Sequence, residues 1–339
     1  QGAIRFNTDS QRLEFYAQGE WWVMSTDTPN LGRSADSSLG VRGLIGGGFD
    51  DSTPNTDQID YINIASTGNS VDFGNLSAGA GFYGCCFASS TRGFFAAMRG
   101  PSATNDIAFV NFSTTGNTID YGDLTRTVKY NPGGAANSTR GLVMGGNTSP
   151  GSAADDTIDA LTMASNGTAF DFGNLANAGR YSTGCASPTR GIYIQGSESN
   201  PTVDTTDIDF VTIATQGDSV KFGDLTSVAI SAGAASNAIR GLVAGGDFSP
   251  NQTNRIDYIT IASSGNGTNF GDLTEARYGA PGCSSSTRAA WAGGSNGSSY
   301  FNIIDYVNIA TQGNAVDFGD RGSGGWTYHG ACSNGHGGL

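Results

Sequence analysis

The chain has 339 residues, of which 52 are glycine, and only 14% of its residues are charged. Long amphipathic helices need many glutamates and lysines, and the chain has four of the former and two of the latter, so we exclude a helical bundle. The net charge of −13 argues against nucleic acid and anionic membrane surfaces as partners, and no apolar run has the length of a transmembrane helix.

The first predicted element is a β-hairpin within residues 1–30. Residues 13–18 are predicted as one strand, Gly19 as part of the turn, and residues 20–22, with two tryptophans, as the returning strand. We assign residues 31–339 to a series of repeats. We expect the hairpin to complete the last repeat, so that the whole chain forms one domain.

A repeat of about 49 residues covers this second region. Its marker is an arginine, preceded by a strand of small residues and followed by a short apolar strand. The six marker arginines are Arg42, Arg92, Arg140, Arg190, Arg240 and Arg288. Because a guanidinium offers five hydrogen-bond donors, we predict that these arginines connect neighbouring repeats.

Two further strands complete each repeat. The third strand alternates apolar and polar residues, as in residues 59–64, and the fourth has the form Val-Asp-Phe-Gly-Asn-Leu, as in residues 71–76. A glycine-centred turn joins them. Four strands in about 49 residues are typical of one blade of a β-propeller, so we predict an all-β propeller.

The glycine pair that closes the second strand, together with the aromatic residue of the fourth, resembles the kelch repeat. The pair is present at residues 46–47, 145–146, 245–246 and 293–294 and absent at residues 98–100 and 195–196. Residues 328–333 read as the first strand of a seventh repeat, and the N-terminal hairpin can supply the strands that this repeat lacks. We predict a seven-bladed kelch-like propeller closed by N-terminal strands. The alternative is a six-bladed ring with the hairpin as a separate attachment element.

Candidate ligand-binding residues lie on the face that carries the variable loops between second and third strands. A tyrosine begins the first strand of five repeats, with Ile230 as the exception, and a basic residue precedes three of the tyrosines. If the first strand is innermost, these tyrosines ring the mouth of the central channel, where aromatic and polar groups suit sugar recognition. The alternative is that they only pack between blades. The predicted ligand-binding residues are Tyr83, Tyr130, Tyr181, Tyr278, Tyr328, Lys129, Arg180 and Arg277.

No catalytic or metal-binding pattern stands out. The two histidines, His329 and His336, are too few for a histidine-rich metal site, and the five cysteines, which lack CxxC spacing, are predicted to be buried core residues. Acidic residues 12 apart recur from blade to blade, which indicates a structural motif rather than one catalytic cleft. These acidic pairs are Asp60 with Asp72, Asp159 with Asp171, and Asp305 with Asp317.

The chain is therefore not expected to be an enzyme or to need a cofactor. Loop acids such as Asp50, Asp51 and Asp57 offer the oxygen ligands that Ca²⁺ prefers, but no EF-hand-like spacing accompanies them.

Residues 2–9 have the form Gly-x-Ile-Arg-Phe-Asn-x-Asp and are followed by a Leu-Glu-aromatic strand, a glycine turn and tryptophan. This segment resembles a short module of bacteriophage tail-fibre and structural proteins, and the repeats resemble propeller repeats of marine phage structural proteins. The resemblance implies an extracellular location on the virion and contacts with other virion proteins.

Our first hypothesis is a tail-fibre adhesin that binds a host-surface glycan or protein receptor through the loops of one face. The alternatives are a virion decoration or scaffold protein without a receptor, and a glycan-degrading propeller enzyme.

Overall fold

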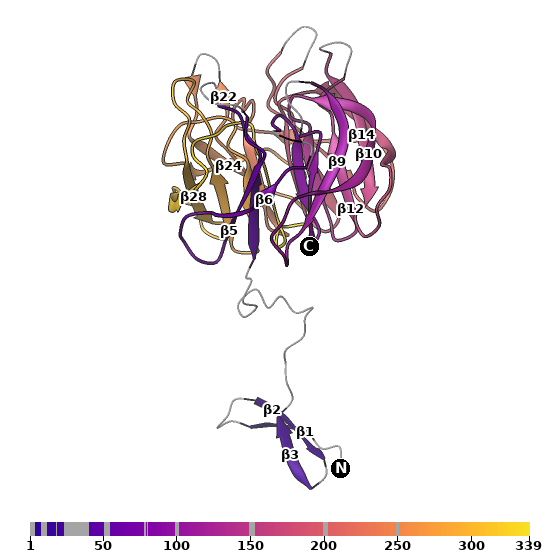
Figure 1. Ribbon diagram of the computed structural model, residues 1–339, viewed down its shortest axis with the longest axis vertical. Helices are drawn as coiled ribbons and strands as arrows, with labels where there is room; N and C mark the ends of the chain where they lie inside the picture. Colours follow the sequence, from indigo (N-terminus) through magenta and orange to yellow (C-terminus); the bar gives the residue numbers. More distant parts are fainter. Residues whose placement is uncertain are drawn as a thin grey trace. The chain divides into compact units, whose positions relative to one another are not determined.

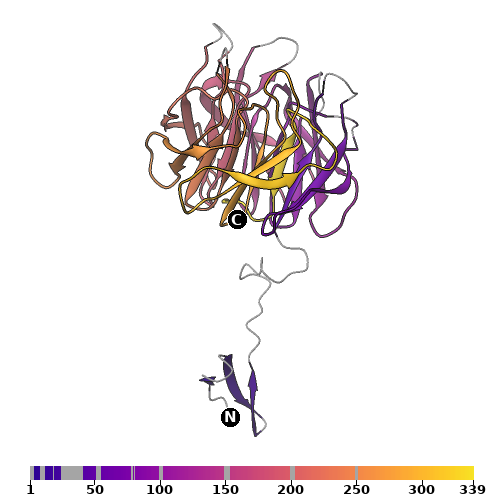
Figure 2. The same ribbon diagram turned by 90° about the vertical axis from the view of Figure 1, so that its left-hand side faces the viewer.

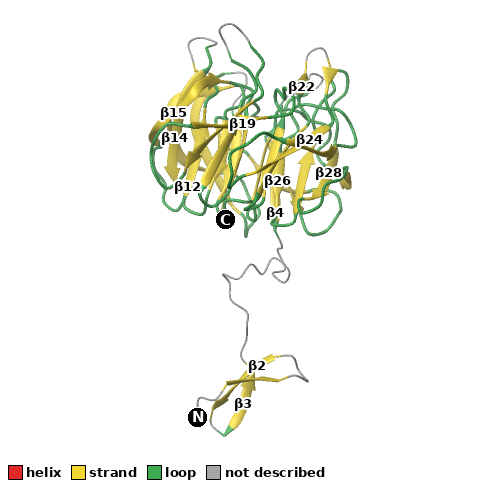
Figure 3. Cartoon of the chain, turned by 180° about the vertical axis from the view of Figure 1, so that it is seen from behind, coloured by secondary structure: helices red, strands yellow, loops and turns green. Residues whose placement is uncertain are grey.

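In a computed structural model of the protein, the chain divides into two compact units, Gln1–Gly40 and Val41–Leu339. The structure describes residues 4–7, 12–17, 19–23, 41–50, 55–77, 79, 81–98, 102–148, 153–198, 203–248 and 251–339. These residues form strands and loops (Figure 3). No helix long and apolar enough to cross a membrane occurs among them.

The second unit is a β-propeller, as predicted, and its described residues form six blades around an axis (Figures 1 and 2). Each blade has four antiparallel strands, and its first strand is innermost because it contacts the first strands of both neighbouring blades.

From the axis outward, the blades are as follows. Blade 1 contains β30 (Gly330–Ser333), β4 (Arg42–Gly46), β5 (Gln58–Asn63) and β6 (Val71–Asn75); blade 2 contains β7 (Cys85–Ala88), β8 (Arg92–Ala96), β9 (Thr104–Asn111) and β10 (Ile119–Lys129). Blade 3 contains β11 (Gly133–Ala136), β12 (Arg140–Met144), β14 (Asp155–Thr162) and β15 (Phe170–Gly179); blade 4 contains β16 (Thr183–Ala186), β17 (Arg190–Ile194), β18 (Asp207–Thr212) and β19 (Val220–Asp224). Blade 5 contains β20 (Gly233–Ser236), β21 (Arg240–Ala244), β24 (Arg255–Thr260) and β25 (Thr268–Asp272); blade 6 contains β26 (Gly282–Ser284), β27 (Arg288–Ala292), β28 (Ile303–Asn308) and β29 (Val316–Asp320).

The prediction of seven blades is wrong, and the six-bladed alternative holds. β30 does not begin a further blade but pairs with β4, with Gly330 opposite Gly46 and Ser333 opposite Gly43. Blade 1 thus takes its inner strand from the end of the chain and its three other strands from the first repeat. The ring is closed by this pairing and not by N-terminal strands.

The first unit contains β1 (Ile4–Asn7), β2 (Arg12–Ala17) and β3 (Glu20–Val23), which pair with one another in one antiparallel sheet. Gly19, with φ of 86°, lies in the turn between β2 and β3, where the hairpin was predicted. In this sheet the Arg5 guanidinium lies 4.1 Å from the centroid of the Trp21 ring.

Each blade repeats one irregularity between its third and fourth strands. In blade 1, Ile59 faces Gly74 and Asp60 faces Asp72, so Phe73 is an extra residue that forms a β-bulge. Gly74 has a φ of 150°, and a Cβ on it would collide with the Gly116 carbonyl of blade 2. The Phe-Gly of the repeat is therefore required by the bulge and by the close approach of the next blade.

The outer edge of each blade is partly paired by the next blade. Gly116 N–H donates to the Phe73 carbonyl at 2.7 Å, and Thr118 N–H donates to the Asn75 carbonyl at 2.9 Å. Equivalent pairs follow at all the other blade junctions, ending with Gly68 and Phe318. These bonds occupy backbone groups that an exposed edge strand would otherwise offer to another chain.

The two ends of the ring differ. We call the upper face the end at which the inner strands begin, near Tyr83, and the lower face the end that carries Arg42 and residues 334–339. Two short hairpin strands, β22 (Asp247–Phe248) and β23 (Asn251–Gln252), extend from blade 5 on the upper face, and β13 (Asn147–Thr148) pairs with β10 there.

Candidate ligand-binding face

The five predicted tyrosines converge at the centre of the upper face. Tyr83 is the hub: its ring centroid lies 4.4 Å from that of Tyr328, 5.2 Å from Tyr130 and 6.4 Å from Tyr181. Tyr130 and Tyr181 are 5.5 Å apart, as are Tyr278 and Tyr328. All five side chains are partly exposed. The rings therefore pack against one another across the axis as a cluster and keep some surface open to solvent.

The backbone beneath these rings is held in a left-handed conformation. Tyr83, Tyr130, Tyr181 and Tyr328 have φ between 52° and 64°, and Ser231 and Gly279 take the equivalent places in blades 5 and 6, with φ of 54° and 65°. For residues other than glycine this conformation costs about 1–2 kcal/mol each.

A closed ring of backbone hydrogen bonds runs through the same residues. In each bond an N–H at the start of one inner strand donates to a carbonyl of the neighbouring blade, at 2.7 to 3.1 Å. The donor–acceptor pairs are Tyr83–Tyr328, Tyr328–Gly279, Gly279–Ser231, Ser231–Tyr181, Tyr181–Tyr130 and Asn131–Tyr83. Hydrogen bonds from all six blades therefore hold this strained backbone in place, and the backbone in turn fixes the positions of the tyrosines.

Tyr278 is one position out of register with the other four tyrosines. The left-handed residue in its blade is Gly279, and Tyr278 itself forms a β-bridge with Ser295. Arg180 forms the same kind of bridge with Ser197, so Tyr278 is structurally equivalent to Arg180 and not to Tyr181. The sequence makes the two tyrosines look equivalent, because a tyrosine follows an arginine in both blades.

Of the three predicted basic residues, two lie beside the tyrosine cluster. Lys129 Nζ is 4.9 Å from the centroid of the Tyr130 ring, and the Arg180 guanidinium is 5.5 Å from that of Tyr181. Arg277 instead is fully buried, and its Nη2 lies 3.0 Å from Oδ2 of Asp305 in the next blade. Arg277 therefore cannot reach a ligand on the upper face.

The aromatic cluster extends beyond the predicted residues. The Phe82 ring lies 4.7 Å from Tyr83 and 5.1 Å from Phe49, which in turn lies 6.4 Å from Tyr300. We call this continuous set of rings the aromatic platform; it comprises Tyr300, Phe49, Phe82, Tyr83, Tyr130, Tyr181, Tyr328 and Tyr278. Phe49, Phe82 and Tyr300 do not recur in the repeat, so the pattern of the repeat does not predict them. Phe49 directly follows the glycines at residues 46–48 and Phe82 precedes Tyr83, which were the available signals, whereas the sequence offers no such signal for Tyr300.

Burial raises the pKa of the Tyr83, Tyr181 and Tyr328 phenols, and neighbouring phenols raise them further. These hydroxyls therefore stay protonated at neutral pH, where they can donate as well as accept hydrogen bonds.

The marker arginines form a second ring, at the lower face. Each guanidinium donates to a carbonyl at the end of the third strand of the next blade: Arg140 Nη1 to Ile213 O at 2.6 Å, for example, and Arg288 Nη1 to Ala65 O at 2.9 Å. Arg190 also lies 4.4 Å from the centroid of the Phe210 ring in its own blade. The six arginines thus tie every blade to the next.

The acidic residues of the third strands bind groups of neighbouring blades in the interior of the ring and do not line a cleft. Asp60 and Asp72 do face each other across strands, but Asp60 is buried, whereas Asp72 is exposed. Asp60 accepts from Arg321 Nε at 2.8 Å, and Asp257 accepts from the Thr226 hydroxyl at 2.7 Å. In both cases the donor comes from the preceding blade. No group of three or more potential metal ligands occurs among the described residues, and Asp51 lies outside them.

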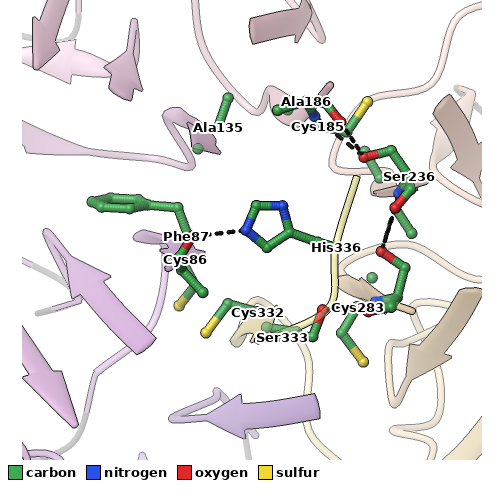
Figure 4. Close-up of a pocket in the computed structure, with 18 of the residues that line it drawn as sticks. Cys86, Phe87, Ala135, Cys185, Ala186, Ser236, Cys283, Cys332, Ser333 and His336 are labelled. Carbon is green, nitrogen blue, oxygen red and sulfur yellow. Dashed lines mark hydrogen bonds between the residues drawn. The ribbon is translucent and has the colours of Figure 1, made fainter. Parts of the chain in front are cut away.

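Inside the ring, the inner strands enclose two small cavities. One, of about 70 Å³, lies beneath the tyrosine cluster and includes Tyr328 and His329 in its lining. The other, of about 50 Å³, is lined by four cysteines, by Phe87 and His336, and by small residues (Figure 4); the cysteines are Cys86, Cys185, Cys283 and Cys332. The five cysteines form no disulfide, and burial raises the pKa of the Cys185 and Cys283 thiols to about 12. These thiols are therefore not poised as nucleophiles.

Residues 334–339 lie across the lower end of the inner strands. His336 Nε2–H donates to the Ala88 carbonyl at 2.7 Å, and Gly338 N–H donates to His336 Nδ1 at 3.1 Å. A Cβ on Gly337 would collide with the carbonyls of Ala186 and Asn237. This segment therefore covers the lower end of the channel that the inner strands surround.

No protein-family model matches the chain, and no curated protein matches its sequence.

Proposed function

We propose that the protein is a receptor-binding propeller, a tail-fibre adhesin of a virion, that binds a host-surface glycan or protein through its upper face. The observation that carries the proposal is the aromatic platform at the centre of that face. Sugar rings bind to aromatic faces through their C–H groups, while neighbouring hydroxyls and amides orient them.

The distribution of charged groups supports binding rather than catalysis. The marker arginines donate to carbonyls of neighbouring blades, and the third-strand acids of five blades are buried. Groups held in this way stabilise the ring and are not available to a substrate. What the upper face offers instead is aromatic surface on a rigid scaffold, surrounded by loops.

The virion assignment rests on the resemblance of residues 2–22 to tail-fibre modules. A module of this kind would join the adhesin to other virion proteins. We also propose that the blades are kelch-like repeats, since the glycine pairs at residues 145–146, 245–246 and 293–294 all have positive φ at the end of the second strand.

The test is a glycan-array and whole-cell binding screen of the full chain, with bound polysaccharide analysed by mass spectrometry for cleavage. We expect binding without cleavage and a loss of binding in Tyr130→Ala and Tyr278→Ala. The matched control is Ile239→Ala, since Ile239 is 62% exposed on the lower face and its removal leaves the platform intact.

Cleavage of the polysaccharide would replace the proposal with a glycan-degrading enzyme. Binding to virion proteins alone would identify a decoration or scaffold protein.

A further inference from the structure

The chain has two lysines, and their surroundings differ sharply. Lys221, on the outer strand β19, lies 2.8 Å from the Asp224 carboxylate and also pairs with Asp207. Lys129 makes no ion pair among the described residues; its ammonium lies over the Tyr130 ring. In a protein with a net charge of −13, a lysine without a carboxylate partner is an exception that needs a reason.

Lys129 has a second cation beside it. Arg180 occupies the same position in blade 4 that Lys129 occupies in blade 3, because Lys129 pairs with Asn147 in the way that Arg180 pairs with Ser197. The rings that the two cations cover, Tyr130 and Tyr181, lie 5.5 Å apart. The other four blades carry uncharged residues at this position: Phe82, Ile230, Tyr278 and Thr327. Positive charge is thus concentrated on one side of the aromatic platform.

We propose that the platform binds an acidic glycan, a sugar chain that bears carboxylate or sulfate groups, and that Lys129 and Arg180 hold the acidic group. This inference rests on the proposed receptor-binding function and names its ligand class. The sugar ring lies on the tyrosines, and the carboxylate or sulfate accepts hydrogen bonds from the ammonium and the guanidinium. Arginine can bind such a group with two parallel hydrogen bonds, and lysine adds a point charge.

The acidic surface of the rest of the protein gives this arrangement selectivity. At a distance the net charge repels polyanions, so an acidic glycan gains attraction only where it reaches the two cations. We therefore expect binding that is specific to the platform and sensitive to salt, because the cations are partly exposed.

The experiment is isothermal titration calorimetry of the full chain with three galactose-based oligosaccharides of equal length: an oligogalacturonate, a sulfated galactan and a neutral galactan. The variants are K129Q, the double variant K129Q/R180Q, and K221Q as the matched control, which makes the same charge change as K129Q away from the platform. Circular dichroism establishes that each variant is folded.

We expect the protein to bind at least one acidic probe more tightly than the neutral one. The double variant should lose about tenfold in affinity for that probe, the size of a charge-assisted contact, whereas K221Q should stay within about twofold. Comparison of the two acidic probes distinguishes carboxylate from sulfate recognition.

Equal affinity for neutral and acidic probes, or equal losses in K129Q and K221Q, overturns the inference. If Tyr130→Ala still abolishes binding of the neutral probe, the receptor-binding function survives that failure. Cell binding that protease treatment removes, with no glycan bound, points to a protein receptor and also overturns the inference. The absence of binding to any probe, cell or array overturns both proposals.

Discussion

The lower face of the propeller repeats one interaction around the ring, whereas the upper face changes from blade to blade. Below, each marker arginine donates to the carbonyl at the end of the third strand of the next blade, and five of them also lie over an aromatic ring of the third strand, as Arg42 does over Tyr61. Above, the inner strands begin with tyrosine in four blades, serine in one and glycine in another, although the left-handed backbone recurs in every blade. The hydrogen bonds between these residues also recur, except that Asn131 donates in place of Tyr130 in blade 3.

The difference separates residues that build the ring from residues that ring closure leaves free to vary. A side chain that recurs at every junction meets the same need each time, which is to join two blades. A side chain that varies on a constant backbone is not required for closure, so the upper residues are open to selection for binding. The aromatic platform, and not the arginine ring, is therefore the region to which we assign the proposed binding function.

The largest predicted effect concerns pH and compares the two histidines at the two ends of the channel. His329 is buried and His336 is half-buried, and burial lowers the pKa of both, that of His329 well below its ordinary value. The unfolded chain therefore takes up protons below about pH 6.5 that the folded chain does not, so stability is full above that pH and falls as the pH drops. We expect a loss of at most about 1.4 kcal/mol per pH unit for each histidine, down to the pKa of the folded state.

Urea unfolding from pH 7.5 to 5 measures this loss. His336→Gln removes the proton uptake of His336 and should reduce the dependence of the free energy of unfolding on pH, leaving the part due to His329. A stability that is unchanged between pH 7 and 5 would contradict the prediction.

The second prediction removes one member of the lower ring. Arg240 donates to the Ile309 carbonyl at 2.9 Å and to the Ala310 carbonyl at 3.0 Å, and its guanidinium lies over the Tyr258 ring. Arg240→Ala should lower the free energy of unfolding by about 2 kcal/mol, since it removes charge-assisted hydrogen bonds at a blade junction. Urea denaturation measures the change, and Lys221→Ala, which breaks an exposed ion pair, should cost less than about 1 kcal/mol. Similar losses of unfolding free energy in the two variants would show that Arg240 contributes no more to stability than an exposed ion pair does.

The smallest predicted effect has the opposite sign and concerns the upper ring. Ser231 has a φ of 54°, and its equivalent in blade 6 is already a glycine. Ser231→Gly should raise the free energy of unfolding by about 0.5–1 kcal/mol, because glycine adopts this conformation without the steric cost. Thermal unfolding provides the measurement, with Ser236→Gly as the control, since Ser236 lies in strand β20 and its hydroxyl donates to the Ala186 carbonyl. Destabilisation by Ser231→Gly would show that the left-handed backbone carries no strain.

Much of the architecture could be read from local patterns. The repeat of about 49 residues, the alternation of the third strands, and the glycine turns predict an all-β propeller, because strand pairing within one blade depends on residues close in sequence. The hairpin around Gly19 was predicted for the same reason. The site prediction depended on the first strand being innermost. Because the structure places the first strand there, the tyrosines at its start lie close together around the axis.

Only the tertiary structure determined the number of blades and which single residues are buried. The pairing of β30 with β4 joins residues more than 280 positions apart, and residues 328–333 look the same in sequence whether they begin a blade or complete one. Arg277 and Arg180 each precede a tyrosine, yet a shift of one residue at Gly279 accompanies the burial of Arg277 against Asp305, while Arg180 remains at the platform. Local propensity determines which strands form, but ring closure and burial depend on contacts between distant blades.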